Sequence, residues 1–182
     1  MDAFEDVVAS FLRNRGHWVE SCFKVKLDKA EKVEIGRPSS PRWELDLLAY
    51  RARDNELMVI ECKSFLDSTG VGISSFGENL KSDRYKLFNE PKLREVVFSR
   101  LAKQLEEQGA ILPSPRIQLC LAAGRIKSTR DRKALHELFH DQGWRLFDEE
   151  WLREEMGALS KESYQNSITS VVAKLLLRGR DI

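Results

Sequence analysis

The chain has 182 residues, of which 42% are hydrophobic and 32% charged, and this composition is typical of one ordinary globular domain. Its net charge is +1, so overall charge neither favours nor excludes a nucleic-acid partner. No apolar run approaches the ~18 residues of a membrane span, and the three widely spaced cysteines are typical of a reduced, cytoplasmic protein.

The N-terminal segment predicts a helix followed by a strand. Apolar residues recur at the spacing of one helical face from Phe4 to Leu12, and Gly16 is typical of the residue after a helix. Residues 18–27 alternate in polarity, as a strand with one buried face does. The residues expected on that one face are Val19, Phe23, Val25 and Leu27.

The next segment predicts a β-hairpin. Residues 34–41 are rich in turn-forming types and predict a loop. Two apolar runs follow, WELDLLAY at 43–50 and ELMVIECK at 56–63, separated by the polar sequence RARDN. Two strand-like runs joined by a short polar turn indicate antiparallel neighbours.

The remainder alternates between helices and strands. After residue 63, a segment rich in Gly and Ser has no clear period and predicts a flexible loop that faces the substrate. Pro91 opens an amphipathic helix that Gly109 closes. Further elements are a strand at 116–123, a helix at 129–142, a strand at 144–147, a helix at 148–157, and a last helix capped by Ser160 that carries Tyr164, Ile168, Val171, Val172, Leu175 and Leu176.

This order predicts an α/β domain over residues 1–157, with a mixed sheet of about five strands between helices. Residues 158–182 are expected to form a C-terminal amphipathic helix that packs on the core or on a second subunit. Its consecutive leucines at 175–177 cover more than one helix face, which favours a homodimer contact.

Three ionisable residues are expected to meet at one end of the hairpin. Asp46 lies near the start of the first strand, and Glu61 and Lys63 lie near the end of the second, on one face because strands alternate. Two adjacent carboxylates repel each other unless a cation neutralises them. Mg²⁺ prefers such oxygen ligands together with phosphate oxygens, and the Lys63 ammonium could orient an attacking water. A surface ion pair is the simpler alternative.

The spacing of Asp46, Glu61 and Lys63 resembles that of the PD-(D/E)XK nucleases, which share the restriction-endonuclease-like three-layer α/β/α fold. The first motif reads Glu44-Leu45-Asp46, without the proline, and the second reads Glu61-Cys62-Lys63. The segment from LCLAAGRIK to WLREEM resembles the end of Mrr-like type IV restriction nuclease domains. The helix after Lys63 carries no evident glutamine-tyrosine motif, which argues against the exonuclease branch.

The resemblance implies a role for each matching residue. Asp46 and Glu61 would be ligands of Mg²⁺ or Mn²⁺, the backbone carbonyl of Cys62 a further ligand, and Lys63 the catalytic lysine. Many family members also carry a glutamate on the first helix. Glu5 matches it in type and position, although an acid in the first turn of a helix is also favoured by the helix dipole.

Basic residues suggest where nucleic acid would bind. In GRIKSTRDRK, residues 124–133, five of ten residues are basic, which fits either a solvated loop or a phosphate-contacting surface. Contacts to phosphates would give affinity without sequence specificity. The candidates are Lys92, Arg94, Arg100, Lys103, Arg125, Lys127, Arg130, Arg132 and Lys133.

A competing motif is HELFH at 136–140, which matches the zinc-protease pattern H-E-x-x-H with Glu137 as base. The third histidine of the extended pattern is replaced by Leu146, and both histidines are predicted to point away from the apolar helix face. Chance is therefore the better explanation. The sequence predicts a Mg²⁺-dependent endonuclease acting on DNA, with a catalytically inactive nucleic-acid-binding module of the same fold as the alternative.

Overall fold

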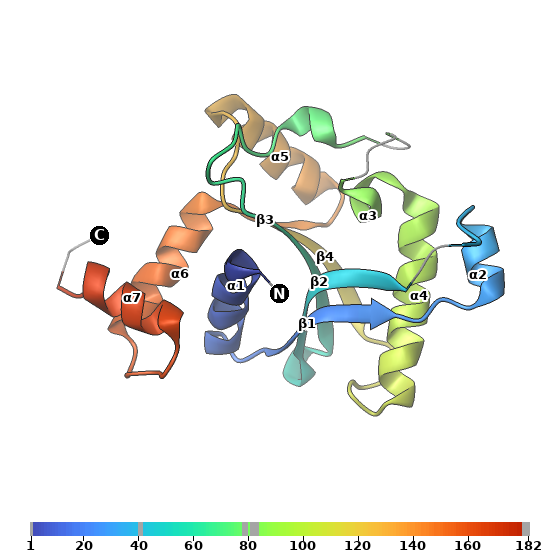
Figure 1. Cartoon of the computed structure of the whole chain (residues 1–182), viewed down its shortest axis with the longest axis horizontal. Coiled ribbons are helices and arrows are strands. Elements are labelled where there is room, and N and C mark those ends of the chain that lie inside the picture. The colour runs from blue at the N-terminus through green and yellow to red at the C-terminus, as the bar shows by residue number, and fades with distance from the viewer. Residues whose placement is uncertain (1, 40–41, 78–79, 81–83, 180–182) are drawn as a thin grey trace.

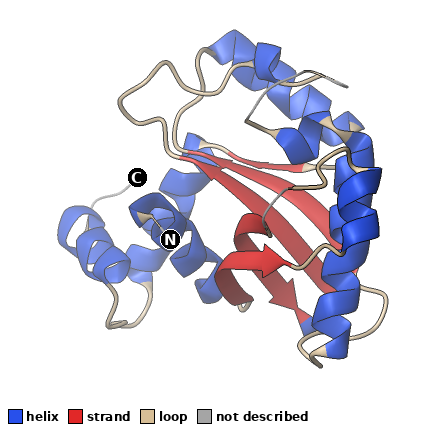
Figure 2. Ribbon diagram, turned by 45° about the vertical axis from the view of Figure 1, so that its right-hand side comes forward, coloured by secondary structure: helices blue, strands red, loops and turns tan. Residues whose placement is uncertain are grey.

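The computed structural model describes residues 2–39, 42–77, 80 and 84–179. Within them a twisted five-stranded sheet lies between two layers of helices (Figure 1), and Figure 2 shows helices on both faces of the sheet. The predicted three-layer α/β arrangement is confirmed. Its elements are α1 (Ala3–Asn14), β1 (Trp18–Val25), α2 (Lys29–Glu34), β2 (Trp43–Arg51), β3 (Glu56–Lys63), α3 (Lys86–Asn89), α4 (Pro91–Glu107), β4 (Arg116–Ala123), α5 (Thr129–Asp141), β5 (Arg145–Phe147), α6 (Glu149–Lys161) and α7 (Ile168–Leu177).

The sheet is mixed, and its strands lie in chain order from β1 to β5. β1, β2 and β3 form an antiparallel meander, whereas β3, β4 and β5 run parallel. A parallel connection needs a crossover, which α4 supplies between β3 and β4 and α5 supplies between β4 and β5. The last residues of β3, β4 and β5 therefore meet at one edge of the sheet, where ligands of open α/β sheets usually bind.

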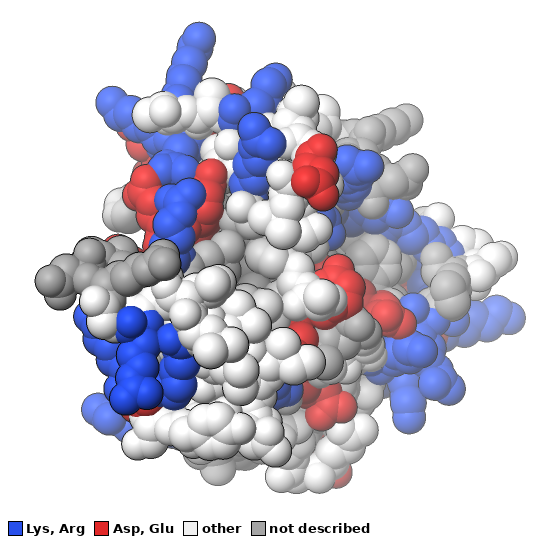
Figure 3. Space-filling model, turned by 60° about the vertical axis from the view of Figure 1, so that its left-hand side comes forward, with Lys and Arg blue, Asp and Glu red and all other residues white. Residues whose placement is uncertain are grey.

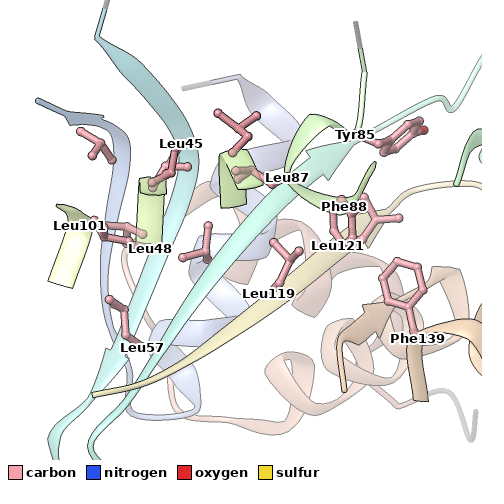
Figure 4. Packing of buried hydrophobic residues seen from close by; sticks show 14 of the residues in the cluster. Leu45, Leu48, Leu57, Tyr85, Leu87, Phe88, Leu101, Leu119, Leu121 and Phe139 are labelled. Carbon is pink, nitrogen blue, oxygen red and sulfur yellow. The ribbon is translucent and has the colours of Figure 1, made fainter. Parts of the chain in front are cut away.

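Two hydrophobic clusters cover the two faces of the sheet. The larger one packs β-strand leucines against α3, α4 and α5, and Figure 4 shows Leu48, Leu57 and Leu119 of the strands within it. The other packs the opposite face against α1 and α6. In β3 the alternation is regular, because Leu57 and Val59 belong to the first cluster and Met58 and Ile60 to the second.

The alternation of β1 and β2 breaks at one position. The ladder passes from the pair Ser21–Leu47 to the pair Phe23–Leu45 and leaves out Cys22 and Asp46, which lie between them. Cys22 has a φ of 53°, in the left-handed region that strand residues avoid. Side chains on either side of this break point to opposite faces.

The break corrects the predicted face of the first strand. Phe23 and Val25 pack with the first cluster as expected, but Val19 packs with the second. The same reversal occurs in β2, where Leu45 belongs to the first cluster and Leu47 to the second. Local interruptions of strand pairing are frequent beside active sites because they redirect a side chain.

Several elements differ from the sequence-based expectation. The short helix α2 was not predicted, although Asp28 and Glu31 form a capping box that its sequence spells out. The expected loop at 34–41 begins only after α2, and residues 40–41 lie outside the described residues. The short helix α3, opened by Tyr85 at a φ of 59°, was also missed.

The C-terminal helix begins later than predicted. Ser160 lies inside α6, and α7 is capped instead by Ser167, whose side chain accepts a hydrogen bond from the Ser170 backbone N–H. α7 packs on α6 through the fully buried Ala173. It leaves an apolar surface exposed, formed by Ile168, Val172, Leu175 and Leu176, and the expected homodimer contact remains a prediction. No helix within the described residues has the length and apolar character needed to cross a membrane.

The starts of the parallel strands are joined by a buried charge cluster. Glu56 begins β3 and its side chain is fully buried. Arg145, at the start of β5, donates to it at 2.8 Å and 3.0 Å, and Arg116, at the start of β4, donates at 2.5 Å. A buried carboxylate requires such partners, so this edge of the sheet is held by ion pairs and is distinct from the edge that carries Lys63.

Replacing Phe139 would measure how much the first cluster contributes to the free energy of unfolding. Its ring is 1% exposed and lies against Phe76, Phe88 and Trp144. Because truncation would leave a cavity among these rings, Phe139→Ala should reduce the free energy of unfolding by about 3–5 kcal/mol. Urea denaturation would measure the change. The neighbouring His140→Ala, at an exposed position, should stay within about 0.5 kcal/mol of the parent protein.

Candidate active site

The three predicted residues meet at the end of the hairpin. The Lys63 Nζ atom lies 2.9 Å from Glu61 Oε1 and 3.8 Å from Asp46 Oδ2. Glu61 and Lys63 share a strand face, and Cys62 packs with the opposite cluster, as the alternation predicted. The sequence-based prediction that these side chains converge is therefore confirmed as geometry.

Asp46 reaches this position through the break in β2. The paired ladder of β2 and β3 ends at Leu47–Ile60, one residue before Asp46. Beyond it, Asp46 Oδ2 accepts a hydrogen bond of 2.8 Å from the Cys62 backbone N–H. The carboxylate thus replaces a backbone acceptor of the ladder and is fixed between the two strands.

Lys63 is a protonated group in a partly buried site. Its side chain is 22% exposed. Burial acts to lower the pKa of Lys63, but the Glu61 carboxylate, by charge and hydrogen bond, and the Asp46 charge together outweigh burial and raise it. At neutral pH the group is an ammonium, so it can donate hydrogen bonds and stabilise negative charge, but it cannot act as a base.

Glu61 faces a pocket that sequence reasoning did not anticipate. The pocket has a volume of about 120 Å³ and includes Asp46, Glu61, Trp43, Tyr85 and Leu87 in its lining. The Tyr85 backbone N–H donates to Glu61 Oε1 at 3.4 Å. Burial, followed by the charge of Glu61, raises the pKa of the Tyr85 hydroxyl to about 12, so this hydroxyl stays protonated. The only sequence signal for Tyr85 is its place just before α3.

Negative charge in the site also affects Glu5 and Cys62, whose pKa values are both raised. Burial raises the pKa of Glu5, and the negative charge of Asp46 raises it further, against a lowering by the hydrogen bond from the Asp2 backbone. The Cys62 thiol is buried, and burial followed by the charges of Asp46 and Glu5 raises its pKa. The charge of Asp46 therefore acts on Glu5, and the role of Glu5 as a helix-borne site residue stays a prediction.

The residues that could hold a metal are two carboxylates with an ammonium beside them. Among the described residues, no group of three His, Cys, Asp or Glu side chains is arranged to hold a metal ion. Mg²⁺ commonly takes only one or two protein carboxylates and completes its shell with water and phosphate oxygens. The donor set of Asp46 and Glu61 fits that requirement in number and chemistry.

The basic residues divide into two groups. Arg94 donates to the Leu87 carbonyl at 2.8 Å and stacks over Trp144, and Arg100 binds Glu31 and Asp28. Arg132 lies among Asp148, Glu149 and Glu150. These three guanidinium groups hold the fold together. Because these guanidinium groups already bind protein partners, they are poorer candidates for phosphate contacts than the sequence suggested.

The second group remains available to a ligand. Within the described part of the chain, Arg125, Lys127 and Arg130 are exposed and form no ion pair within 4.0 Å. Lys103 and Lys133 are also exposed, with only a 4.0 Å contact one helical turn away. Figure 3 shows basic side chains on one face in separate groups, so any electrostatic attraction of an anion is local.

The histidines of HELFH make different contacts. His136 Nε2 lies 3.0 Å from Asp148 Oδ2, and Asp148 caps α6 by accepting from the Glu150 and Trp151 backbone. The His140 side chain is 91% exposed and lies 3.4 Å from Asp141. Neither contact supplies a third ligand, so the described residues offer no support for the zinc-protease alternative.

Comparison of the chain with protein-family models, with curated proteins and with solved structures gave no match.

A substitution at Glu5 would test, without any ligand, whether the negative charge near Asp46 destabilises the folded protein. Because its pKa is raised in the folded state, its ionisation opposes folding above that pKa, and this penalty disappears below the unfolded pKa. Glu5→Gln retains a side-chain acceptor for the Asp2 N–H. It should increase the free energy of unfolding at pH 7 only slightly, by about 0.5 kcal/mol or less because solvent screens this partly exposed carboxyl, and leave it unchanged at pH 3. Urea denaturation at both pH values would show this, and destabilisation at pH 7 would contradict it.

Proposed function

We propose that this protein is a metal-dependent nuclease that hydrolyses the phosphodiester bonds of DNA. The observation that carries the proposal is the convergence of Asp46, Glu61 and Lys63 at the end of an apolar hairpin. The resemblance of Asp46 and the Glu61-Cys62-Lys63 triplet to the PD-(D/E)XK motif supports the same conclusion.

A surface ion pair does not account for this arrangement. Exposed pairs stabilise a protein by under about 1 kcal/mol and need no buried support. Here Lys63 and Glu61 are partly buried, Asp46 is held by a backbone hydrogen bond, and strand pairing is interrupted to place it there. Such costs at one site are typical of functional constraint.

Asp46 and Glu61 would hold a Mg²⁺ or Mn²⁺ ion, with the Cys62 carbonyl as a predicted further ligand. When bound, such an ion lowers the pKa of a water and offsets negative charge on the phosphate. The alternative in which this site binds nucleic acid without cleaving it remains the second candidate. It is favoured by the direct Lys63–Glu61 ion pair, which neutralises one carboxylate without a metal.

Lys63 would act as a hydrogen-bond donor in the reaction. Because its pKa is raised, the ammonium persists at neutral pH and can orient the attacking water and stabilise the charge that develops on the phosphate oxygens. Tyr85 would position Glu61. The backbone N–H of Tyr85 donates to Glu61 Oε1, which leaves the other carboxylate oxygen of Glu61 for a ligand. Arg125, Lys127 and Arg130 would bind flanking phosphates.

Metal binding separates the two candidates. At a Mn²⁺ concentration a hundredfold above the Kd, binding should stabilise the protein by about 2.7 kcal/mol, which corresponds to a rise in Tm of roughly 5–10 °C for a chain of this size. A thermal-shift titration measures this rise. Asp46→Ala should abolish it, whereas Glu95→Gln, which changes an exposed carboxylate of α4, should retain it. A parent protein that shows no shift would favour the binding module.

Lys63 tests the proposed chemistry. Lys63→Ala should keep the Mn²⁺ response, because both carboxylates remain, and should lower the rate of cleavage by at least about 10²-fold, since one transition-state donor is lost. The measurement is nicking of supercoiled DNA with Mg²⁺ or Mn²⁺. Lys161→Ala removes an exposed lysine at the end of α6, outside the candidate nucleic-acid contacts, and serves as the matched control. Cleavage by Lys63→Ala at the parent rate would remove Lys63 from the mechanism.

A further inference from the structure

The inference concerns Leu66, an apolar side chain that stands exposed three residues after Lys63. Leu66 is 63% exposed, whereas the apolar residue before it, Phe65, packs against the first cluster, and the residues after it, Asp67 and Ser68, are polar. A large apolar side chain left in water gives up the free energy that its burial would contribute to folding. A single exposed leucine is ordinary on a protein surface, so its meaning depends on its support and its surroundings.

Leu66 is held at the corner of a tight turn. The Ser68 backbone N–H donates to the Phe65 carbonyl at 3.2 Å, which closes a four-residue turn with Leu66 and Asp67 at its tip. Phe65 has a φ of 44°, in the left-handed region. Turn corners favour polar residues, Gly and Pro, so a leucine at this tip is not explained by the turn itself.

The turn rests on the segment that follows β4. The Gly124 backbone N–H donates to the Lys63 carbonyl at 2.9 Å. A Cβ atom at Gly124 would lie 2.3 Å from the Ser64 carbonyl oxygen and 3.2 Å from Leu66 Cδ2, so only glycine permits this approach. Leu66 is therefore fixed against the chain segment that pairs with the end of β3.

Further hydrogen bonds make this support rigid. Val71 and Ile126 form a parallel bridge, in which the Val71 N–H donates to the Arg125 carbonyl and the Lys127 N–H donates to the Val71 carbonyl, both at 2.9 Å. The Ile73 N–H donates to Asp131 Oδ1 at 2.9 Å. These described parts of the segment after Lys63 are thus anchored, whereas a flexible loop was predicted there, and residues 78–79 and 81–83 lie outside the described residues.

Exposed basic side chains lie in the segment that supports the turn. Arg125 and Lys127 lie on either side of the buried Ile126 of this bridge, and Arg130 lies in the first turn of α5. Within the described residues these three side chains make no ion pair. An exposed apolar side chain close to exposed basic side chains matches the requirements of a duplex, which presents phosphates outside and apolar base faces inside.

We propose that Leu66 is a wedge that enters the base stack of a duplex beside the phosphate that Lys63 addresses, and that the preferred substrate is therefore DNA with weakened stacking, such as a mismatch or bulge. The inference rests on the proposed function. Insertion of an apolar wedge costs a few kcal/mol of unstacking in an intact duplex, and a mismatch has already lost part of that stability.

The test compares two duplexes of otherwise identical sequence, one perfect and one with a single central mismatch. Fluorescence anisotropy in EDTA measures binding without cleavage. The parent protein should bind the mismatched duplex about tenfold more tightly, equivalent to about 1.4 kcal/mol of unstacking. Leu66→Ser should bring the two affinities within about twofold. Leu66→Phe, which keeps an apolar wedge, should retain the preference.

Leu112→Ser is the matched control. Leu112 is 52% exposed but lies in the loop before β4, at the opposite edge of the sheet, so its replacement should leave the mismatch preference unchanged. A second readout is 2-aminopurine placed beside the mismatch. Its fluorescence should rise when the parent protein binds, because the base loses its stacking neighbour, and should not rise with Leu66→Ser.

The outcomes for the wedge and for the nuclease are separable. Equal affinities of the parent protein for both duplexes, or a preference that survives Leu66→Ser, would overturn the wedge, and cleavage of both duplexes with Mg²⁺ would then still support the nuclease. Conversely, a Leu66-dependent preference without cleavage under Mg²⁺ or Mn²⁺ would support the wedge and overturn the nuclease.

Discussion

The hydrogen bond between the Asp46 carboxylate and the Cys62 backbone N–H is the constraint on which the site depends. It stands where the β2–β3 ladder would otherwise continue, so a side chain takes the place of a backbone acceptor. Because an unpaired N–H in a partly buried strand is costly, the interaction ties the position of Asp46 to the pairing of the sheet. Lys63 and Glu61 are then within reach without any adjustment of the backbone.

This constraint explains why strand pairing is interrupted at Cys22 and Asp46. A regular strand would place Asp46 on the face opposite to Leu45 and Leu47, with its carboxylate directed away from the strand backbone. The break reverses the alternation, keeps leucines in both core clusters, and leaves Asp46 in the plane between strands. The left-handed φ of Cys22 is the conformational cost of that arrangement.

The two edges of the parallel strands carry opposite kinds of charge arrangement. At the starting edge, the fully buried Glu56 is satisfied by two arginines, and the cluster holds β3, β4 and β5 together. At the other edge, two carboxylates share one ammonium, and the charge of Asp46 contributes to the raised pKa of Glu5. In the first arrangement the cations neutralise the carboxylate, whereas in the second one negative charge stays uncompensated, and a bound cation would neutralise it. The end of the sheet that carries Lys63 is therefore the one suited to bind a metal ion.

Much of the fold follows from the sequence because its signals are local. The alternation in 56–63 placed Glu61 and Lys63 on one face, the hairpin pattern brought Asp46 to them, and Pro91 and Gly109 delimited α4 within two residues. The capping box at Asp28 and Glu31 could have revealed α2. In contrast, the alternation rule failed at Val19, because the pairing of β1 with β2 is interrupted at Cys22 and Asp46 and the side chains change face there.

Only the tertiary structure shows which residues the charged and the exposed side chains contact. The sequence could not separate Arg100, which binds Glu31 sixty-nine residues away, from Arg125, which has no ion-pair partner among the described residues. Nor could it place Tyr85 beside Glu61 or Leu66 against Gly124. Local patterns determine how a segment folds and which face it buries, but a charge or a turn acquires its role from residues that are distant in sequence. Those contacts exist only once the sheet has brought the segments together.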